Sequence, residues 1–393
     1  MKVLRIIYDF ADSNNFTGGL SPAPYELSLA QSALNNKIYV LCGNLNKKNL
    51  LKKRFFYKIN ENILVYNLPR GLPHFGPFLT TSVLVPLYYL YFKFRHKIDL
   101  VHNHQHLGVW LLLYKYIFGF IDKTPFIGHF HVTAKGREES ILSSGVKLPL
   151  FTKYFEYPIH KFSDFLQTRV CKHLFCVSEN IKEEVINFYK VDSSKITVIE
   201  SAVSIEKFTK DIKKINLNYE NGSIILGYVG RISKRKGIDI MLETLKSLPE
   251  VYKLVLWGEF QDLQYKKHVE HLVEKFKLQS RFSYKGAINY FENQNAFSVI
   301  DIFLIPSSYE GLPKVILEAL VSHCYVIASG FKIKEDIPNL KFLEKIDPTY
   351  LTKDVLEAKL SEENYKKTLN IIRDKYSYEN RAEQIQKIYI SLK

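Results

Sequence analysis

Four cations crowded into six residues form the first group in this sequence that could do chemistry. They follow Gly230 directly and include Arg231 and Lys236. A guanidinium can contact a phosphate through two parallel hydrogen bonds, and an ammonium group acts as a compact positive charge. We therefore predict that Arg231 and Lys236 bind a diphosphate, whereas Lys234 and Arg235 fit a solvated turn.

Two carboxylates lie in a second segment, at Glu310 and Glu318. Glu310 ends a loop after an apolar run, and Glu318 lies in the helix that Pro313 is suited to begin. A loop carboxylate can accept hydrogen bonds from sugar hydroxyls, and a helix carboxylate can hold a ribose diol. The amides of Gly311 and Leu312 lie at the positive helix end, where they could meet a sugar or a phosphate. A helix-capping acid and a surface glutamate are the alternative interpretations.

A glycine pair, Gly18-Gly19, follows the first apolar run of the chain. Adjacent glycines before a helix let backbone N–H groups approach an anion. Such a pair is also common in ordinary loops, so on its own it is weak evidence for a phosphate site.

Five histidines near two predicted strand ends raise the question of a metal. Three alternate along one strand, and the other two belong to a neighbouring strand end: His102, His104, His106, His129 and His131. Imidazoles on one face of a strand could bind zinc or nickel. No cysteine or carboxylate completes a ligand set, and no Asp-x-Asp sequence occurs in the chain. We therefore predict no metal site.

The elements that position these residues are short apolar runs alternating with longer helical patterns, which is typical of parallel sheets with crossover helices. Ligands of such sheets bind at the carboxyl ends of the strands. The predicted strands are 3–8, 37–41, 63–66, 100–102, 126–129, 173–177 and 195–199, then 224–229, 253–257, 282–284, 302–305 and 326–328. Helices are predicted near 238–248, 261–276, 313–322, 361–374 and 378–392. Another helix is predicted directly after Ser178, which is expected to be its N-cap.

The strand–helix rhythm stops at a hydrophilic stretch, 204–222, and then restarts. We therefore predict an α/β protein of two tandem Rossmann-like, doubly wound domains facing a central cleft. The predicted domains are residues 1–203 and residues 204–375. The terminal helix, 376–393, is expected to pack back on the first domain.

Composition bounds the class of protein. With 393 residues, of which 46% are hydrophobic, the chain is long enough for two cores and too apolar to be disordered. Four cysteines without a C-x-x-C pair indicate a reducing, cytoplasmic setting. Residues 1–178 carry 22 basic and 10 acidic side chains, whereas residues 179–393 carry 33 and 30. The first half could therefore face nucleic acid, a membrane surface or a phosphorylated substrate, or its charge could simply be solvated.

One apolar stretch, 71–92, contains no Asp, Glu, Lys or Arg and is long enough to span a bilayer. It also contains three prolines, and three cations follow it at Lys93, Arg95 and Lys97. A core helix with an aromatic face is the favoured interpretation. A surface that dips into the membrane interface and a true span are the alternatives.

The whole chain resembles the retaining GT-B glycosyltransferases of family GT4. Glu310 and Glu318 match the family's E-x7-E motif, and residues 230–237 match G-R-x4-K-G. Gly18-Gly19 matches its amino-terminal glycine pair. Two further matches are D-x-x-H-x-H at Asp99, His102 and His104, and P-x5-H at Pro125 and His131.

The resemblance implies that residues 1–203 lie on the acceptor side and that residues 204–375 bind the donor. Arg231 and Lys236 would bind the donor diphosphate and stabilise its charge as the glycosidic bond breaks. Glu318 would hold the nucleoside ribose, and Glu310 the donor sugar. The family's donor-site motifs also include Gly230, Gly311 and Leu312.

The amides of Gly18 and Gly19 would close on the phosphates from the other domain, and His131 would lie beside the donor sugar. The implied catalytic residues are His131, Glu310, Arg231 and Lys236. The resemblance implies same-face attack without a protein nucleophile, no cofactor and no obligatory metal.

Three segments depart from the family pattern and leave the donor's identity open. The usual N-G-V-D turn is Ser201-Ala202-Val203-Ser204, the turn 322–326 lacks its glycine, and 330–337 lacks a glycine pair.

The expected partners are a nucleotide-diphosphate-sugar donor and a glycan or lipid-linked acceptor of cell-surface polysaccharide synthesis. We also expect peripheral contact with an anionic membrane at the inner face of the cytoplasmic membrane, and no nucleic acid. A non-catalytic sugar-nucleotide-binding subunit and a basic nucleic-acid-binding protein are the alternative functions.

Overall fold

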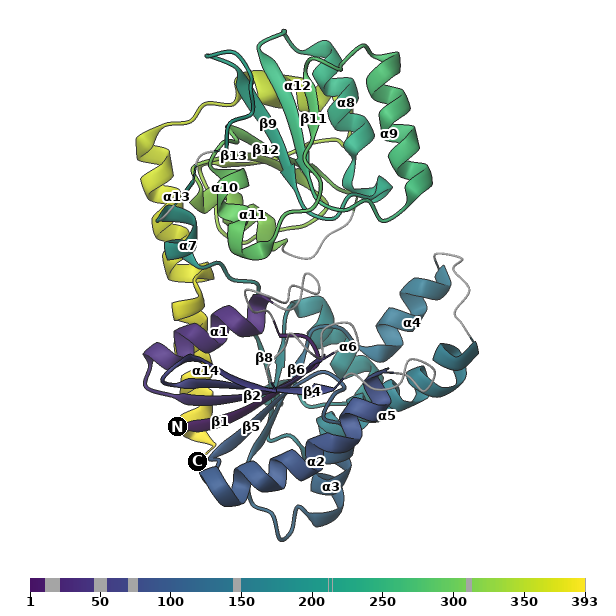
Figure 1. Cartoon of the computed structure of the whole chain (residues 1–393), viewed down its shortest axis with the longest axis vertical. Coiled ribbons are helices and arrows are strands. Elements are labelled where there is room, and N and C mark those ends of the chain that lie inside the picture. Colours follow the sequence, from purple (N-terminus) through teal and green to yellow (C-terminus); the bar gives the residue numbers. More distant parts are fainter. Residues whose placement is uncertain are drawn as a thin grey trace. The chain divides into compact units, whose positions relative to one another are not determined.

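The computed structural model describes residues 1–10, 22–45, 55–69, 77–143, 150–210, 212–213, 215–308 and 313–392. They form two compact units (Figure 1). Unit 1 comprises residues 1–200 and 381–393, and unit 2 comprises residues 201–380. Each unit is built on its own sheet, so the predicted pair of doubly wound α/β domains is confirmed.

The boundary between the units differs from the expected one by a few residues. The chain passes from one unit to the other twice, after residue 200 and after residue 380, and the segments just inside unit 2 pair with each other. Val203 donates its N–H to the carbonyl of Tyr376 at 2.8 Å and forms an isolated parallel bridge with Ser377. Residues 201–203 and 376–380 therefore belong to unit 2. Helix α14, Tyr378–Ser391, contributes residues 381–391 to unit 1.

Unit 1 contains an eight-stranded sheet in the order β3-β4-β2-β1-β5-β6-β7-β8, in which only β3 and β4 pair antiparallel. The strands are β1 Lys2–Ile7, β2 Lys37–Leu45, β3 Phe56–Asn60, β4 Ile63–Pro69, β5 Leu100–His104, β6 Phe126–Phe130, β7 His173–Cys176 and β8 Ile196–Val198. Its helices are α1 Pro22–Ala33, α2 Pro77–His96, α3 Val109–Phe118, α4 Ala134–Ser143, η2 Thr152–Glu156, α5 Tyr157–Val170, α6 Glu179–Tyr189 and η3 Ser193–Lys195.

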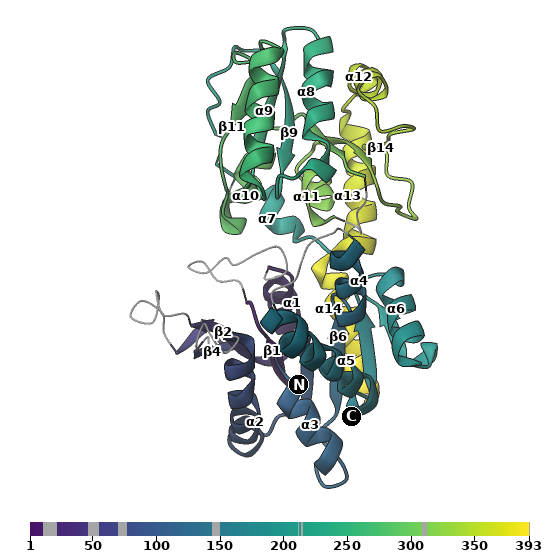
Figure 2. The same cartoon turned by 90° about the vertical axis from the view of Figure 1, so that its right-hand side faces the viewer.

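Side chains alternate between the two faces of this sheet, as strand geometry requires. Leu4 and Ile6 join the core beneath α2, α3 and α5. Arg5 lies between them in sequence and points to the opposite face, where it donates to the carbonyl of Pro24 in α1 at 3.0 Å. Figures 1 and 2 show α14 running along the sheet of unit 1 beside α1.

Unit 2 contains a parallel six-stranded sheet in the order β11-β10-β9-β12-β13-β14. Its strands are β9 Ile224–Val229, β10 Tyr252–Trp257, β11 Phe282–Tyr284, β12 Ile302–Pro306, β13 Tyr325–Ser329 and β14 Leu340–Phe342. Its helices are α7 Ile205–Thr209, η4 Lys234–Lys236, α8 Ile238–Ser247, α9 Leu263–Lys275, η5 Tyr290–Glu292, α10 Asn293–Phe297, α11 Lys314–Val321, α12 Pro348–Glu357 and α13 Glu362–Tyr376.

Helix α2 contains most of the apolar stretch that raised the membrane question. Tyr89 and Phe92 are fully buried against the sheet, as the core interpretation expects, whereas Tyr91 is 48% exposed. Within the described residues, no helix is both long and apolar enough to cross a bilayer. The favoured interpretation of this stretch as a core helix therefore holds for one of its faces.

Candidate functional site

The four clustered cations lie in a loop of unit 2, residues 230–237, which we call the cationic loop. It follows β9 directly and starts beside the end of β10. Gly230 donates its N–H to the carbonyl of Trp257 at 2.9 Å and has a φ of 147°. Gly258 has a φ of 142°, and a Cβ placed there would lie 1.7 Å from the carbonyl oxygen of Gly230. The two backbones therefore pass so closely that a side chain at Gly258 is excluded.

The same loop is fastened to the end of the neighbouring strand, β12. Gly237 has a φ of 72°, and a Cβ there would lie 2.4 Å from the carbonyl oxygen of Pro306. Ser308 donates its N–H to the carbonyl of Arg235 at 3.0 Å. The loop is thereby held across the carboxyl ends of β9 and β12, which are adjacent in the sheet.

The two cations predicted to bind phosphate differ in exposure. Arg231 is exposed, and its carbonyl accepts a hydrogen bond from the Tyr228 hydroxyl at 2.8 Å. Lys236 is only 9% exposed. A buried side chain has less conformational freedom than an exposed one, so Lys236 is the more strongly preorganised of the two.

Glu318 lies in α11 and is 3% exposed. The side-chain amide of Asn293 donates to its carboxylate at 3.2 Å, and the Lys207 ammonium donates to the same amide's oxygen at 2.8 Å. Lys207 also lies 3.1 Å from the centre of the Tyr290 ring. Sequence reasoning missed Lys207, Tyr290 and Asn293, because they occur in short helical turns that carry no motif.

Several predicted site residues fall outside the described residues. These are Gly18 and Gly19 in unit 1, and Glu310, Gly311 and Leu312 in unit 2. Their roles remain predictions.

In unit 1, His131 directly follows β6 and lies beside a stack of buried imidazoles. Its Nε2 is 3.1 Å from His104 Nδ1, and burial lowers the pKa of His131 to about 4. The rings of His129 and His131 are parallel within 7°, with centres 4.6 Å apart. At the other end, His102 Nε2 lies 3.3 Å from His129 Nδ1, and His102 Nδ1 lies 2.6 Å from the Tyr389 hydroxyl of α14. We call His102, His104, His129 and His131 the histidine stack.

The histidine stack also bears on the metal question. His102, His104 and His129 each offer a nitrogen within 4.8 Å of the others. His102 Nε2 and His129 Nδ1 lie 3.3 Å apart, and the planes of the three rings are inclined to one another by 7° to 26°. Imidazole nitrogens are ligands that zinc uses in proteins. The expectation that the protein needs no metal stays a prediction.

A second group of buried titratable side chains lies close to the start of α4. Asp164 accepts hydrogen bonds from the Ala134 N–H at 2.7 Å and the Tyr189 hydroxyl at 2.9 Å. His106 Nδ1 approaches its other oxygen at 3.3 Å, and the His106 ring stacks on His160. Burial raises the pKa of Asp164 to about 7, although both hydrogen bonds oppose this shift.

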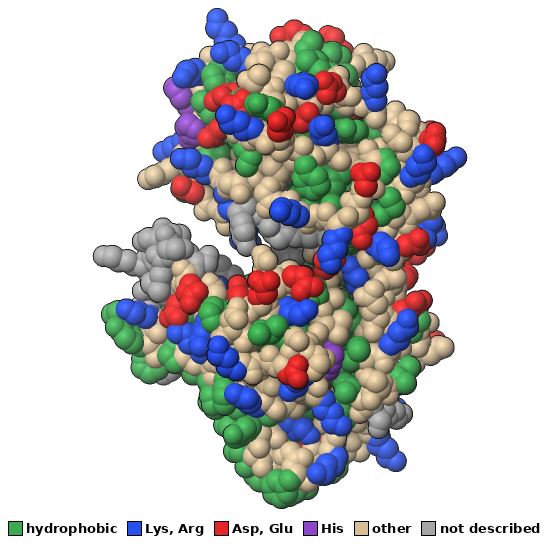
Figure 3. Space-filling view, turned by 180° about the vertical axis from the view of Figure 1, so that it is seen from behind, with side chains coloured by type: hydrophobic (Ala, Val, Ile, Leu, Met, Phe, Trp, Pro, Cys, Tyr) green, Lys and Arg blue, Asp and Glu red, His purple; other side chains and the backbone are tan. Residues whose placement is uncertain are grey.

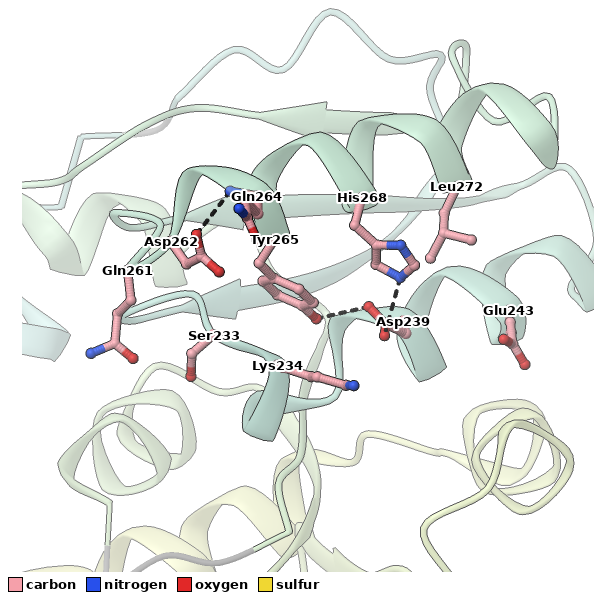
Figure 4. A pocket seen from close by; sticks show the side chains of 10 residues that line it. All are labelled: Ser233, Lys234, Asp239, Glu243, Gln261, Asp262, Gln264, Tyr265, His268 and Leu272. Atoms are coloured by element: carbon pink, nitrogen blue, oxygen red, sulfur yellow. Dashed lines mark hydrogen bonds and ion pairs between the residues drawn. The ribbon is translucent and has the colours of Figure 1, made fainter. Parts of the chain in front are cut away.

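A polar pocket of about 680 Å³ lies between η4, α8 and α9 (Figure 4). It contains Lys234, but Arg231, Lys236 and Glu318 are not among its lining residues. Asp239 accepts a hydrogen bond from the Tyr265 hydroxyl at 2.8 Å, and two further acids, Glu243 and Asp262, also line the pocket. This acidic lining is unsuited to a diphosphate.

Two family models match the chain in succession. The model of "Glycosyltransferase Family 4" matches residues 17–207, and that of "Glycosyl transferases group 1" matches residues 208–338. The chain belongs to the family 4 glycosyltransferases. The cationic loop and Glu318 therefore belong to the half of this glycosyltransferase that matches the group 1 model.

Similar proteins support the same assignment. The chain is 25% identical over 349 residues to an uncharacterised glycosyltransferase of Methanocaldococcus jannaschii, covering 86% of this chain and 88% of the relative. It is 29% identical over 174 residues to the UDP-Gal:alpha-D-GlcNAc-diphosphoundecaprenol alpha-1,3-galactosyltransferase of Escherichia coli, covering 41% of this chain and 43% of the relative.

Solved structures of glycosyltransferases share the fold. Sucrose-phosphate synthase of Thermosynechococcus elongatus superposes with a TM-score of 0.70 at 17% identity, over 100% of this chain and 98% of that one. HepE of Anabaena, solved in complex with UDP, has a TM-score of 0.68 at 17% identity, with both chains covered completely. This glycosyltransferase therefore has the predicted GT-B fold.

Proposed function

We propose that this glycosyltransferase moves a sugar from a nucleotide-diphosphate sugar to a glycan or lipid-linked acceptor, with retention of configuration, in the synthesis of a cell-surface polysaccharide. The observation that best supports a nucleotide-diphosphate-sugar donor is the cationic loop. Its backbone is fixed by two glycines with positive φ across adjacent strand ends, and it contains both Arg231 and Lys236. HepE, a structural neighbour, binds UDP and UDP-glucose, which supports a nucleotide-sugar donor.

In the proposed donor complex, Arg231 and Lys236 contact the diphosphate. Negative charge develops on the leaving phosphate oxygen as its bond to the anomeric carbon breaks, and fixed cations stabilise that charge without reorganisation. The buried carboxylate of Glu318 accepts hydrogen bonds from the ribose hydroxyls, with Asn293 holding one carboxylate oxygen in place. Glu310, Gly311 and Leu312 complete the donor contacts in this proposal.

In the proposed transfer step, the acceptor hydroxyl attacks the anomeric carbon on the face that the diphosphate leaves. The oxygen–carbon bond to the acceptor forms as the bond to phosphate breaks, and the acceptor's proton passes to the leaving phosphate oxygen. No protein nucleophile is required. His131, kept neutral near pH 7 because burial lowers its pKa to about 4, can donate or accept a hydrogen bond beside the sugar without adding charge.

The acceptor class rests on the curated relatives and on the charge of unit 1. The relatives include an O-antigen mannosyltransferase of Salmonella typhimurium and a capsular polysaccharide glycosyltransferase of Staphylococcus aureus. The galactosyltransferase of Escherichia coli acts on a diphosphoundecaprenol-linked sugar. A lipid-linked acceptor would be reached at an anionic membrane surface, which suits the excess of cations in residues 1–178.

The test is donor turnover measured across a panel of UDP-, GDP- and ADP-sugars, followed by the same assay on single variants. Arg231→Ala and Lys236→Ala are each expected to lower kcat/KM roughly 100-fold, because each removes a fixed charge from the leaving group. Lys234→Ala is the matched control, since Lys234 lies in the same turn but lines the acidic pocket. Wild-type turnover in both Arg231→Ala and Lys236→Ala would refute the donor site.

A further inference from the structure

Helix α2 carries an apolar stripe on the side that faces away from the core. Its exposed positions recur at helical spacing, at Val83, Leu87, Tyr91 and Phe94. These side chains are 56%, 64%, 48% and 77% exposed. A helix that packs only against its own domain has polar residues on this side, so an apolar outer stripe marks a surface that meets something else.

Exposed apolar side chains continue over the two helices that pack next to α2. Helix α3 contacts both α2 and α5, so the three form one layer. The end of α3 and the turn after it expose Tyr116, Ile117, Phe118, Phe120 and Ile121, and η2 with α5 exposes Phe151, Tyr154, Phe155, Phe162 and Phe165. Figure 3 shows such side chains gathered over the flank and end of unit 1, with Lys and Arg among them. We call this surface the aromatic face.

A basic pocket of about 430 Å³ opens beside the aromatic face, between the end of α3 and the end of α5. Four cations line it, namely Lys115, Lys123, Arg169 and Lys172, and the described residues of its lining include no carboxylate. Tyr116 belongs both to this lining and to the exposed aromatic set. The pocket therefore joins the aromatic face to a concentration of positive charge.

Among the described residues, none of the four cations of the basic pocket forms a salt bridge with a carboxylate, and the Lys115 ammonium donates to the backbone carbonyl of Asp122. Asp122, the nearest acid in sequence, is 1% exposed. Its carboxylate accepts a hydrogen bond from the Tyr89 hydroxyl at 2.6 Å and forms an ion pair with Lys93 at 2.7 Å. Burial lowers the pKa of Lys115, and repulsion from Lys93, Lys172 and Lys123 lowers it further against the attraction of Asp122. An anion in the pocket would relieve this repulsion.

The basic pocket is separate from the proposed reaction site. Its residues Pro125 and Phe126 lie at the amino end of β6, and Lys172 immediately precedes β7. His104 and His131 lie at the carboxyl ends of the parallel strands β5 and β6. The basic pocket therefore lies at the amino ends of these strands, opposite the carboxyl ends where the reaction is proposed. Binding of the donor diphosphate does not explain its cations.

The combination of side chains identifies the occupant. The segments 77–96, 109–123 and 150–172 contain eight basic and three acidic residues, and two of the acids, Asp122 and Asp164, are buried. Apolar and aromatic side chains surrounded by cations suit the boundary between lipid headgroups and acyl chains. Each cation near an anionic leaflet strengthens binding roughly fivefold.

We propose that the aromatic face docks on an anionic lipid bilayer, with a lipid headgroup phosphate in the basic pocket. Leu87, Tyr91 and Phe94 enter the interface, and Lys123, Arg169 and Lys172 contact the phosphate. This inference extends the proposed function, since docking would bring the enzyme to a lipid-linked acceptor, but its test does not depend on turnover.

The experiment is co-sedimentation of the full chain with vesicles of phosphatidylcholine alone and of phosphatidylcholine with about 30% phosphatidylglycerol. Tight binding is expected only to the anionic vesicles, weakening with salt. Replacing Lys123, Arg169 and Lys172 by Gln together should weaken partitioning roughly 100-fold. The matched control replaces the exposed Lys267, Lys285 and Lys359 of unit 2 by Gln and should bind as the wild type does.

The apolar contribution has its own variant, in which Leu87 and Phe94 become Ser. Both side chains are more than half exposed, so the fold should persist, and Trp110 fluorescence checks it. Binding should fall at least tenfold at every salt concentration, because apolar insertion is not screened. Two results would overturn the proposal. One is that the wild type does not bind anionic vesicles at low salt, and the other is that the triple Gln variants of unit 1 and of unit 2 lose vesicle binding equally. Donor hydrolysis without vesicles, measured on the same samples, separates this failure from a failure of the proposed function.

Discussion

Mild acid is expected to destabilise unit 1 much more than unit 2, because unit 1 buries its histidines in the neutral form. His102, His104, His106 and His129 are at most 9% exposed, and burial lowers the pKa of each well below its usual value. Arg5 also lowers the pKa of His102, His104 and His129. The three histidines of unit 2 lie at or near the surface.

The sign and size of the effect follow from proton linkage. The unfolded chain protonates each histidine near pH 6.5, whereas the folded unit does not, so acid favours unfolding below that pH. Burial also lowers the pKa of His131 and of His160 to about 4. Between about pH 7.5 and about pH 5.5 each of these six histidines loses about 1.4 kcal/mol, or about 8 kcal/mol together. Asp164 opposes this loss, because its folded pKa of about 7 lies above its unfolded value and contributes about 2 kcal/mol as the pH falls. The net loss is about 6 kcal/mol, a large part of a typical stability of about 5–15 kcal/mol.

The two tryptophans make the assay specific to one unit, since Trp110 lies in unit 1 and Trp257 in unit 2. Urea unfolding followed by fluorescence in a Trp257→Phe protein reports unit 1, and a Trp110→Phe protein reports unit 2. His129→Leu should recover about 1.4 kcal/mol of the loss, because it removes one linked proton. His271→Gln, at an exposed site of α9, should change nothing. A free energy of unfolding for unit 1 that stays level between these pH values would refute the reasoning.

Three further predictions concern single side chains. Glu318→Gln should weaken binding of the nucleotide that the donor panel identifies by roughly 10- to 100-fold in calorimetry, because it removes a charged acceptor; unchanged affinity would rule out a ribose contact. Gly258→Ala should lower the free energy of unfolding of unit 2 in urea by roughly 3 kcal/mol or more, because its Cβ would lie 1.7 Å from a backbone oxygen. At Gly222 a Cβ meets no atom within 4 Å, so Gly222→Ala should be milder. Tyr389→Phe should destabilise unit 1 by about 1–3 kcal/mol, since His102 loses its hydroxyl partner; an equal free energy of unfolding by Trp110 fluorescence would contradict this.

The strands that position the donor residues could be predicted closely from the sequence. Strand β9 was expected at 224–229, as observed, and β12 begins at the expected residue 302. Both are buried parallel strands, so their sequences are continuous apolar runs bounded by glycine or polar residues. Strands β3 and β14 were missed, because they are short edge strands with partly exposed side chains and lack such a run.

The histidine stack could be predicted only in part. Alternation places His102 and His104 on one face of β5, but the register that sets His104 opposite His129 depends on how β5 and β6 pair. Tyr389 lies 287 residues from His102, and no local pattern links them. The Ser178 cap is a local feature and was predicted correctly, since its hydroxyl accepts the Ile181 N–H at 3.3 Å.

The uneven charge of the chain has a physical explanation in these two proposals. A donor diphosphate is a single ligand in a fixed position, so a few held cations suffice, and Lys236 is held by burial in the nearly neutral half of the chain. A membrane is an extended anionic surface that attracts the summed charge of a face, so many exposed cations are effective there without fixed geometry. Raising the salt concentration should therefore release the enzyme from anionic vesicles while leaving its affinity for the nucleotide much less changed. Parallel salt dependence of the two would show that both rely on the same diffuse field.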